Sequence, residues 1–273
     1  MSHAARTWLV RVAVILYLGA LVGLPVVFLF DRALGQGLAA FWVQVTRPDA
    51  VAALKLSAEV ALVAVPLNTV VGVGAALLLA RRTFIGHRAL TTAFDVPVAV
   101  SPIIIGVALV LAYSRIGWTG AWLSAHGVRI LFSPAGIVLA TVAVSLPYVL
   151  RSVLPVLVEV GSEQEQAART LGAGDLRIFW QVTLPAIRWG VLYGVTLTIA
   201  RTLGEFGAVL VVSGNISGRT QTLPIYIYDR WDQSYNTLGA FAGALVLATI
   251  SIVALAILST LRSRERRLHV DIA

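Results

Sequence analysis

The sequence predicts an all-α membrane protein with six transmembrane helices, and three observations support this fold class. The 273 residues are 58% hydrophobic and have a mean hydropathy of +0.87. Only 12% of them are charged, about half of the ~25% typical of soluble domains. Six apolar runs are each long enough for the ~20 residues that cross a bilayer. Soluble enzymes and disordered chains are excluded, and the absence of cysteine excludes disulfide scaffolds and thiol chemistry.

The six runs follow one another without a repeat or a flexible linker, so we expect one membrane domain over residues 1–273. The first run is too long for the apolar core of a signal peptide. Prolines inside the runs are compatible with spans, because neighbouring helices can satisfy the freed backbone groups. The predicted spans cover residues 12–30, 60–80, 96–114, 130–150, 189–212 and 236–261.

The distribution of basic residues predicts the orientation. With the N-terminus inside, 13 of the 21 basic residues lie in cytoplasmic segments, 7 lie outside, and Arg201 lies within the membrane. Cytoplasmic segments carry an excess of Lys and Arg. Six spans return the chain to its starting side, so we expect both termini to be cytoplasmic. This placement also explains the net charge of +8 without a nucleic-acid partner.

The cytoplasmic segment between the fourth and fifth runs, residues 151–188, is longer and more patterned than the other connections. Ser162 and Glu165 have the spacing of a capping box that begins a short helix. Gly172 suits the left-handed residue that ends such a helix. Asp175 is placed to cap a second short helix over 176–182. Two interpretations remain open: a docking site for a partner protein, or an ordinary amphipathic hairpin at the membrane surface.

The stretch EQEQAARTLGAGDLRIFWQVTLP (163–185) resembles the EAA loop of bacterial ABC-importer permeases, which reads E-A-A-x-x-x-G followed by L-P. Gln166 stands where that family has Glu, so Glu163 or Glu165 would have to supply the missing charge. The matching residues are Ala167, Ala168, Gly172, Leu184 and Pro185. Segments such as ARTLGEFGAVLVVSGNI and YNTLGAF resemble the sulfate/thiosulfate branch, and its W-type permeases more than its T-type permeases.

This resemblance implies a type I importer permease fold in the bacterial cytoplasmic (inner) membrane. It implies a homologous T-type permease, a dimer of ATPase subunits and an extracytoplasmic sulfate/thiosulfate-binding protein as partners. It also implies that the EAA loop is a coupling helix seated on the ATPase. The sequence has no P-loop motif, so ATP and Mg are expected on the ATPase, and we expect no cofactor and no enzymatic activity in this chain.

Ionisable residues at membrane depth are costly and mark pathways or partners. Arg201 and Glu205 lie four residues apart, on one face of a helix. One interpretation is an ion pair that orders the bundle or a subunit interface, which we favour because a neutralised arginine is a poor anion site. The other is that Arg201 helps an anion to cross while Glu205 positions or gates it.

Two further residues are candidates for the pathway or a gate. Asp95 precedes Pro97, and we expect it to cap the third span, with a contact to Arg201 or to a cytoplasmic arginine as the alternative. Ser101 precedes Pro102, which predicts either a packed kink or a helix opened toward a pore.

The external segment 213–235 is polar and aromatic. Its tyrosines and Trp231 suit the aromatic belt of a membrane protein. Arg219 and Arg230 are candidates for contact with a binding protein. The four histidines are scattered, so we expect no metal site.

The sequence therefore favours a permease subunit of an ATP-driven sulfate/thiosulfate importer. A molybdate or tungstate permease is the alternative within the same class. A secondary anion transporter would not explain the patterned loop, and a membrane enzyme would need a catalytic constellation that the sequence lacks.

Overall fold

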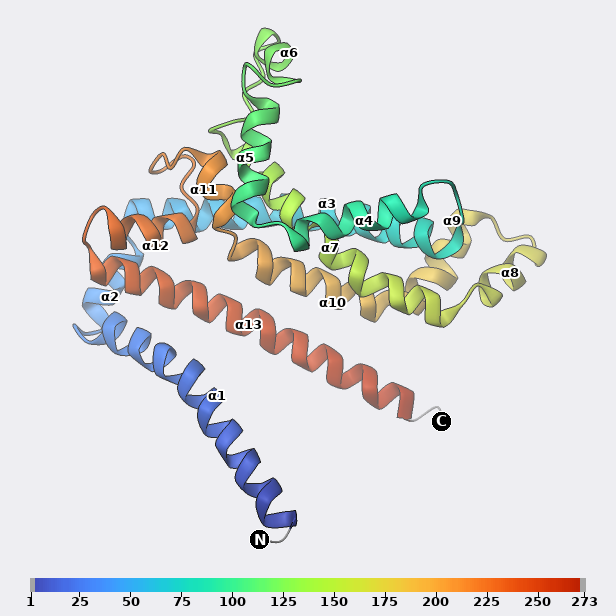
Figure 1. Ribbon diagram of the computed structural model, residues 1–273, viewed down its shortest axis with the longest axis horizontal. Helices are drawn as coiled ribbons and strands as arrows, with labels where there is room; N and C mark the ends of the chain where they lie inside the picture. The colour runs from blue at the N-terminus through green and yellow to red at the C-terminus, as the bar shows by residue number, and fades with distance from the viewer. Residues whose placement is uncertain (1–2, 271–273) are drawn as a thin grey trace.

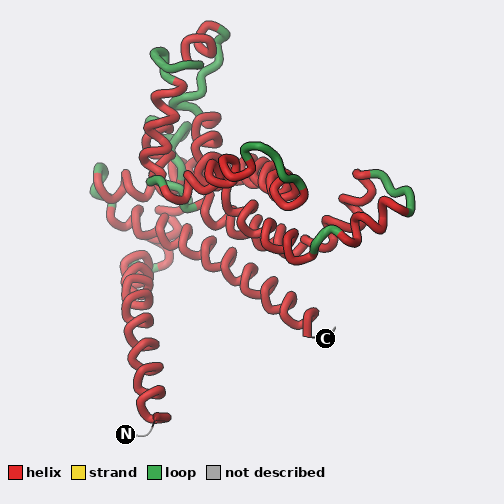
Figure 2. Tube along the Cα trace, turned by 45° about the vertical axis from the view of Figure 1, so that its right-hand side comes forward, coloured by secondary structure: helices red, strands yellow, loops and turns green. Residues whose placement is uncertain are grey.

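A computed structural model describes residues 3–270, and every regular element in that range is helical (Figure 2). The all-α prediction is confirmed. In chain order the elements are α1 (His3–Leu34), α2 (Leu38–Val45), α3 (Pro48–Arg81), α4 (His87–Ala99), α5 (Pro102–Tyr113), α6 (Gly120–Ala125), α7 (Pro134–Val160), α8 (Glu163–Thr170), α9 (Asp175–Ile178), the π-helical turn η1 (Phe179–Thr183), α10 (Leu184–Leu203), α11 (Gly207–Ser213), α12 (Leu223–Asp232) and α13 (Thr237–Val270).

Five helical stretches are long and apolar enough to cross a membrane, and the bent pair α4–α5 makes a sixth if it is one span. The five stretches are Arg11–Leu34, Pro48–Arg81, Pro134–Val160, Asp175–Leu203 and Thr237–Ala254. The number agrees with the six predicted runs only when α4 and α5 are counted together.

Helices α3, α7 and α10 form the centre of the bundle. Glycines allow their backbones to approach closely: a Cβ on Gly72 would lie 2.8 Å from the Val149 Cβ, and one on Gly194 would lie 3.0 Å from the Val149 Cα. Small residues at helix contacts are the usual means of packing in a membrane. The buried core of this region joins α3, α4, α7 and α10 and consists of Val73, Ala76, Leu79, Phe94, Val149, Leu150, Val153, Leu157 and Ile187.

Helix α1 lies at the edge of the bundle (Figure 1). None of its most apolar 18-residue stretch is buried within the chain. Its contacts include Phe28, whose ring meets Phe241 of α13 edge to face at 5.8 Å, and the Arg32 guanidinium lies 5.1 Å from the Phe28 ring. The exposed apolar side chains of α1 are therefore available to contact lipid or another subunit.

Several helices extend past the apolar runs that predicted them. Helix α3 begins at Pro48 rather than at residue 60, because proline is favoured at a first helical position and Asp49 is favoured in the first turn. Helix α7 continues to Val160, because Val153 and Leu157 lie four residues apart and are both fully buried. The segment outside the long helices is therefore shorter than the predicted loop, 151–188.

Two predicted spans are interrupted. The run 96–114 is divided between α4 and α5, and the helix axis bends by 113° at the break between them. Pro102 lacks an N–H and disfavours a helical Ser101, and Ser101 adopts an extended conformation, with φ −58° and ψ 136°. The run 189–212 is divided at residues 204–206 into α10 and α11. Helix α5 leaves the bundle and carries α6 outward (Figure 1).

Candidate functional site

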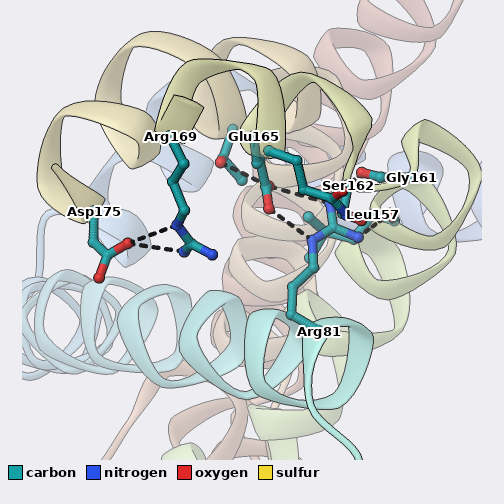
Figure 3. Close-up of polar contacts among 9 residues, drawn as sticks. Arg81, Leu157, Gly161, Ser162, Glu165, Arg169 and Asp175 are labelled. Carbon is teal, nitrogen blue, oxygen red and sulfur yellow. Dashed lines mark hydrogen bonds and ion pairs between the residues drawn. The ribbon is translucent and has the colours of Figure 1, made fainter. Parts of the chain in front are cut away.

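The loop between α7 and α10 lies at the end of the bundle where α3 ends and α4 begins (Figure 1). Its helix α8 is fixed to the bundle by Arg81, the last residue of α3 (Figure 3). Arg81 Nε donates to Glu165 Oε2 at 3.0 Å, and its Nη2 donates to Glu165 Oε1 at 3.2 Å. The two side chains are 18% and 16% exposed, so this ion pair is largely shielded from solvent.

The predicted left-handed end of the first loop helix is confirmed at Gly172, whose φ is +83°. The Gly172 N–H donates to the Arg169 carbonyl at 2.9 Å, and the Ala173 N–H donates to the Ala168 carbonyl at 3.0 Å. This pair of bonds is a Schellman motif. It turns the chain sharply between α8 and α9.

The predicted capping box is wrong. Ser162 makes no side-chain cap to the backbone. Its hydroxyl instead accepts a hydrogen bond from Gln166 Nε2 at 2.8 Å. Glu165 cannot complete the box, because its carboxylate is engaged by Arg81 and by Thr183, whose hydroxyl donates at 2.8 Å.

The second loop helix begins at Asp175 itself, so Asp175 is not its cap, and the helix does not end at residue 182. It passes through η1 into α10 as one stretch, Asp175–Leu203. Arg169 pairs with Asp175 at 2.8 Å across the turn, where both side chains are well exposed (Figure 3). Ile178 is buried, whereas three large apolar side chains of this loop are exposed: Leu171 (88%), Leu176 (74%) and Trp180 (60%).

The remaining loop candidates divide between surface and core. Leu184 begins α10 and packs against the buried core, and Pro185 follows it. Ala168 is partly buried. Glu163, Gln166, Ala167 and Pro185 are exposed. The loop thus presents polar and apolar groups together on a surface fixed at its base.

The two interrupted spans meet at their interruptions. A Cβ on Gly207, the first residue of α11, would lie 3.2 Å from Pro102 Cβ at the start of α5. A Cβ on Gly106 would lie 2.8 Å from the Ala208 carbonyl oxygen. Close backbone contact of this kind requires glycine. The starts of α5 and α11 are therefore packed together.

Arg201 and Glu205 lie beside this junction and form the predicted ion pair, at 3.1 Å. Arg201 Nε also donates to the Tyr148 hydroxyl of α7 at 3.2 Å. Glu205 lies just beyond α10 rather than within it, and its Oε1 accepts the Ala208 N–H at 3.1 Å, which caps α11. The side chain of Glu205 is 2% exposed and that of Arg201 is 32% exposed.

Asp95 lies inside α4, so the predicted cap is wrong. It pairs instead with Arg151 of α7 at 2.6 Å, one of the arginines that the predicted orientation assigns to the cytoplasmic side. Tyr148 and Arg151 are three residues apart and share one side of α7. The Asp95–Arg151 ion pair and the Arg201–Tyr148 hydrogen bond therefore lie one turn apart along α7. Ser101 is exposed at the break before α5.

The two residues predicted to contact a binding protein differ in exposure. Arg219 is exposed in the turn before α12. Arg230 forms an ion pair with Asp49 of α3, with its side chain 15% exposed, and its guanidinium lies 5.1 Å from the Tyr226 ring. Burial lowers the pKa of Arg230, and the positive charge of Arg47 lowers it further. The paired Asp49 carboxylate offsets part of the cost of burying this cation. Arg230 therefore fixes α12 to α3.

Among the residues whose side chains the structure describes, no group of His, Asp and Glu is arranged to hold a metal ion. Sequence reasoning missed Arg81, Thr183 and Tyr148 as partners of the candidates, and it did not single out Arg151 among the arginines open to Asp95. Each of these contacts joins residues more than 15 positions apart.

Comparisons with known proteins agree with this architecture. The family described as binding-protein-dependent transport system inner membrane component matches residues 69–267. The sulfate transport system permease protein CysW of Synechocystis sp. is 46% identical over 248 residues, which cover 91% of this chain and 90% of the relative. The sulfate transport system permease protein CysT of Synechococcus elongatus is 36% identical, covering 96% and 95%. A bacterial alginate ABC transporter, solved in complex with its alginate pentasaccharide-bound periplasmic protein, contains a chain of the same fold, with a TM-score of 0.74 at 16% identity, covering 97% and 96%.

Proposed function

The chain belongs to the family of binding-protein-dependent transport system inner membrane components, and we propose that it is a permease subunit of an ATP-driven sulfate importer. The observation that supports this proposal most strongly is the 46% identity, over nine-tenths of both chains, to a sulfate transport permease of the CysW type. Identity to the CysT type is lower, at 36%. We therefore assign the chain to the W-type position, beside a T-type permease.

The rest of the importer follows from this assignment. A permease of this family works with a binding protein, and the alginate transporter of the same fold was solved with its periplasmic protein. We propose an external sulfate/thiosulfate-binding protein, a dimer of ATPase subunits and the T-type permease as partners. The exposed Arg219 is our candidate for contact with the binding protein. Arg230 is paired with Asp49, so its proposed role in this contact is indirect: it holds α12 in position.

The loop over α8 and α9 is our candidate for the ATPase contact. Exposed Leu171, Leu176 and Trp180 lie at the end of α8, in α9 and in η1, respectively. The Schellman motif and the Arg81–Glu165 pair hold this loop in place. Apolar side chains on a fixed, solvent-facing loop are characteristic of protein docking sites. Gln166 can still donate and accept hydrogen bonds, and Glu163 supplies an exposed negative charge beside it.

We place the translocation pathway beside the junction of α5 and α11. Arg201, Glu205, Asp95 and Ser101 lie at or near two interrupted helices, and non-helical backbone at membrane depth is tolerated where it is buried in protein or lines a water-filled cavity. Both carboxylates are paired with arginines, so these groups would bind a sulfate dianion weakly, as release into the cytoplasm requires. Separation of the Arg201–Glu205 pair would free a positive charge during transport.

Uptake of radiolabelled sulfate tests the proposal. In a strain that lacks this chain but retains the other subunits, restoring the chain should restore uptake, and excess unlabelled thiosulfate should suppress it. The absence of gene-dependent sulfate uptake would move the substrate to molybdate or tungstate. Uptake that persists without the ATPase would indicate a secondary anion transporter.

A further inference from the structure

Arg81 makes four hydrogen bonds to groups on three parts of the chain outside its own helix. Besides the two bonds to Glu165, its Nη1 donates to the Leu157 carbonyl at 3.0 Å and its Nη2 donates to the Gly161 carbonyl at 2.5 Å (Figure 3). A guanidinium has five N–H donors in a planar fork, and four of them are used here. The side chain is therefore held in one orientation.

Two of these bonds complete the end of α7. The last four carbonyls of a helix have no partner within the helix, and Leu157 carries one of them, since α7 ends at Val160. Gly161 leaves the helix with a φ of +69°. A cation at this position also interacts favourably with the negative end of the helix dipole. Arg81 thus joins the ends of α3 and α7.

The Glu165 carboxylate extends the connection to α10. Its Oε1 accepts from both Arg81 and Thr183, and Thr183 is 5% exposed at the end of η1. A π-helical turn contains an additional residue relative to an α-helix. It therefore rotates the residues before it by roughly 100° relative to α10. We call Arg81, Glu165 and Thr183 the loop anchor. The Glu165 carboxylate on α8 binds Arg81 of α3 and Thr183 just before α10, and Arg81 in turn binds the end of α7.

We propose that the loop anchor is the positioning element that transmits displacement of α8 to the transmembrane helices. This inference rests on the proposed contact between the loop and the ATPase. Without the anchor, α8 is connected to the bundle through Gly161 at one end and the turn at Gly172 and Gly174 at the other. Each of these residues accepts a Cβ without contact, so neither turn is packed against the bundle at that point. Movement of the loop would then be absorbed in the turns.

Breaking one partner of a shielded ion pair is expensive, because the remaining charge is left without compensation. For Arg81→Ala we expect hydrogen exchange of the α8 amides to accelerate by about tenfold, which corresponds to about 1.4 kcal/mol of local opening free energy. We expect the number of sulfate ions transported per ATP hydrolysed to fall by about tenfold. ATP hydrolysis itself continues, because the residues that hydrolyse ATP lie on another chain.

The experiment uses the assembled importer in lipid nanodiscs for hydrogen exchange and in proteoliposomes for transport. Arg82→Ala is the matched control, because Arg82 is adjacent, carries the same charge, is exposed, and makes no ion pair among the described residues. We expect it to change neither exchange nor the transport ratio. Arg81→Lys keeps the charge but lacks the planar fork, and should give intermediate values of both.

A milder substitution covers the case in which Arg81→Ala fails to assemble. Thr183→Val removes one hydrogen bond of the anchor and leaves the volume nearly unchanged. Thr196→Val, in the same helical stretch, removes a hydroxyl whose one hydrogen bond among the described residues goes to the Leu192 carbonyl one turn away. We expect the first substitution to accelerate α8 exchange and lower the transport ratio, and the second to do neither.

Unchanged α8 exchange in both Arg81→Ala and Thr183→Val would overturn the anchor, whatever the importer transports. Accelerated exchange with an unchanged transport ratio would overturn its role in transmission. If the unsubstituted complex took up no sulfate, the proposed function would fail, while the exchange measurement would still test the anchor.

Discussion

The chain contains two shielded Arg–Glu pairs that are built in opposite ways. Arg81 and Glu165 come from helices far apart in the sequence, and four hydrogen bonds hold the arginine. Arg201 and Glu205 are four residues apart across a helix break, and Glu205 Oε2 is buried without a hydrogen bond although Arg201 Nη2 lies 3.1 Å away. Both carboxylate oxygens of Glu165 accept hydrogen bonds, whereas Glu205 Oε2 accepts none.

This difference indicates different tasks. Fully satisfied polar networks rigidify a structure, whereas a buried unsatisfied group is a place where function or strain is expected. The pair at the base of the loop fixes one arrangement of three helices. The pair at the break retains an unused acceptor and a partly exposed arginine, so it is suited to rearrange when α10 and α11 move.

The largest expected effect separates the two interpretations of the second pair. Glu205→Ala leaves Arg201 without its counter-ion and the Ala208 N–H without its acceptor, so we expect a loss of about 3 kcal/mol in unfolding free energy. Unfolding in mixed micelles, followed by tryptophan fluorescence, measures it. The double substitution Arg201→Ala with Glu205→Ala should recover part of the loss. A loss in the double variant equal to the sum of the losses in the two single variants would contradict an energetic coupling between the two residues.

The helix junction beside that pair gives the next effect. A methyl group on Gly106 would lie 2.8 Å from a backbone oxygen, which cannot move without shifting α11. We expect Gly106→Ala to lower the unfolding free energy by about 2 kcal/mol. Gly74→Ala, where nothing lies within 4 Å of the added Cβ, should be neutral or slightly stabilising. A loss of the same size at both positions would contradict the close contact of α5 with α11.

The loop gives a smaller effect on stability with a large effect on transport. Gly172 has a φ of +83° and Gly174 has a φ of −74°, while neither Cβ would meet another atom. Gly172→Val should therefore cost about 1–2 kcal/mol through backbone strain alone. We expect it to leave the chain inserted but to abolish ATP-dependent sulfate uptake, whereas Gly174→Val should retain uptake. Full uptake in Gly172→Val would contradict the coupling assignment of the loop.

The exposed pair Asp95–Arg151 gives the smallest effect. Its side chains are 48% and 49% exposed, so solvent screens the pair. Asp95→Asn should change the unfolding free energy by about 0.5 kcal/mol, and the loss should shrink further at high salt. A loss as large as that of Glu205→Ala would show that this pair is structural rather than screened.

The sequence was sufficient for the fold class, the approximate spans and the family. Composition and apolar run length decide the first two, and the loop motif with its adjoining segments identified the W-type permease branch, which the comparisons confirm. Local geometry was also predictable where a single residue determines it, as at Gly172 and at the Ser101–Pro102 break. The Arg201–Glu205 pair was predictable because its spacing is local.

The contacts that join distant segments were not predictable. Glu165 has the spacing of a capping box, but Arg81 and Thr183 donate three hydrogen bonds to its carboxylate, and this tertiary arrangement outweighs the local one. Asp95 has the position of a cap, but α4 already begins at His87 and packs against the core through Phe94. Asp95 therefore lies inside the helix, where it pairs with Arg151 of α7. Hydropathy reports neither the bend of 113° nor the π-helical turn, because both depend on packing.

Uptake of radiolabelled sulfate into proteoliposomes tests whether this chain is a permease subunit of an ATP-driven sulfate importer. The vesicles would contain this chain with a T-type permease, the ATPase and a sulfate-binding protein, with ATP supplied on the ATPase side. We expect uptake that requires ATP, requires this chain and is inhibited by thiosulfate. Sulfate uptake of equal rate without ATP, or without this chain, would contradict it.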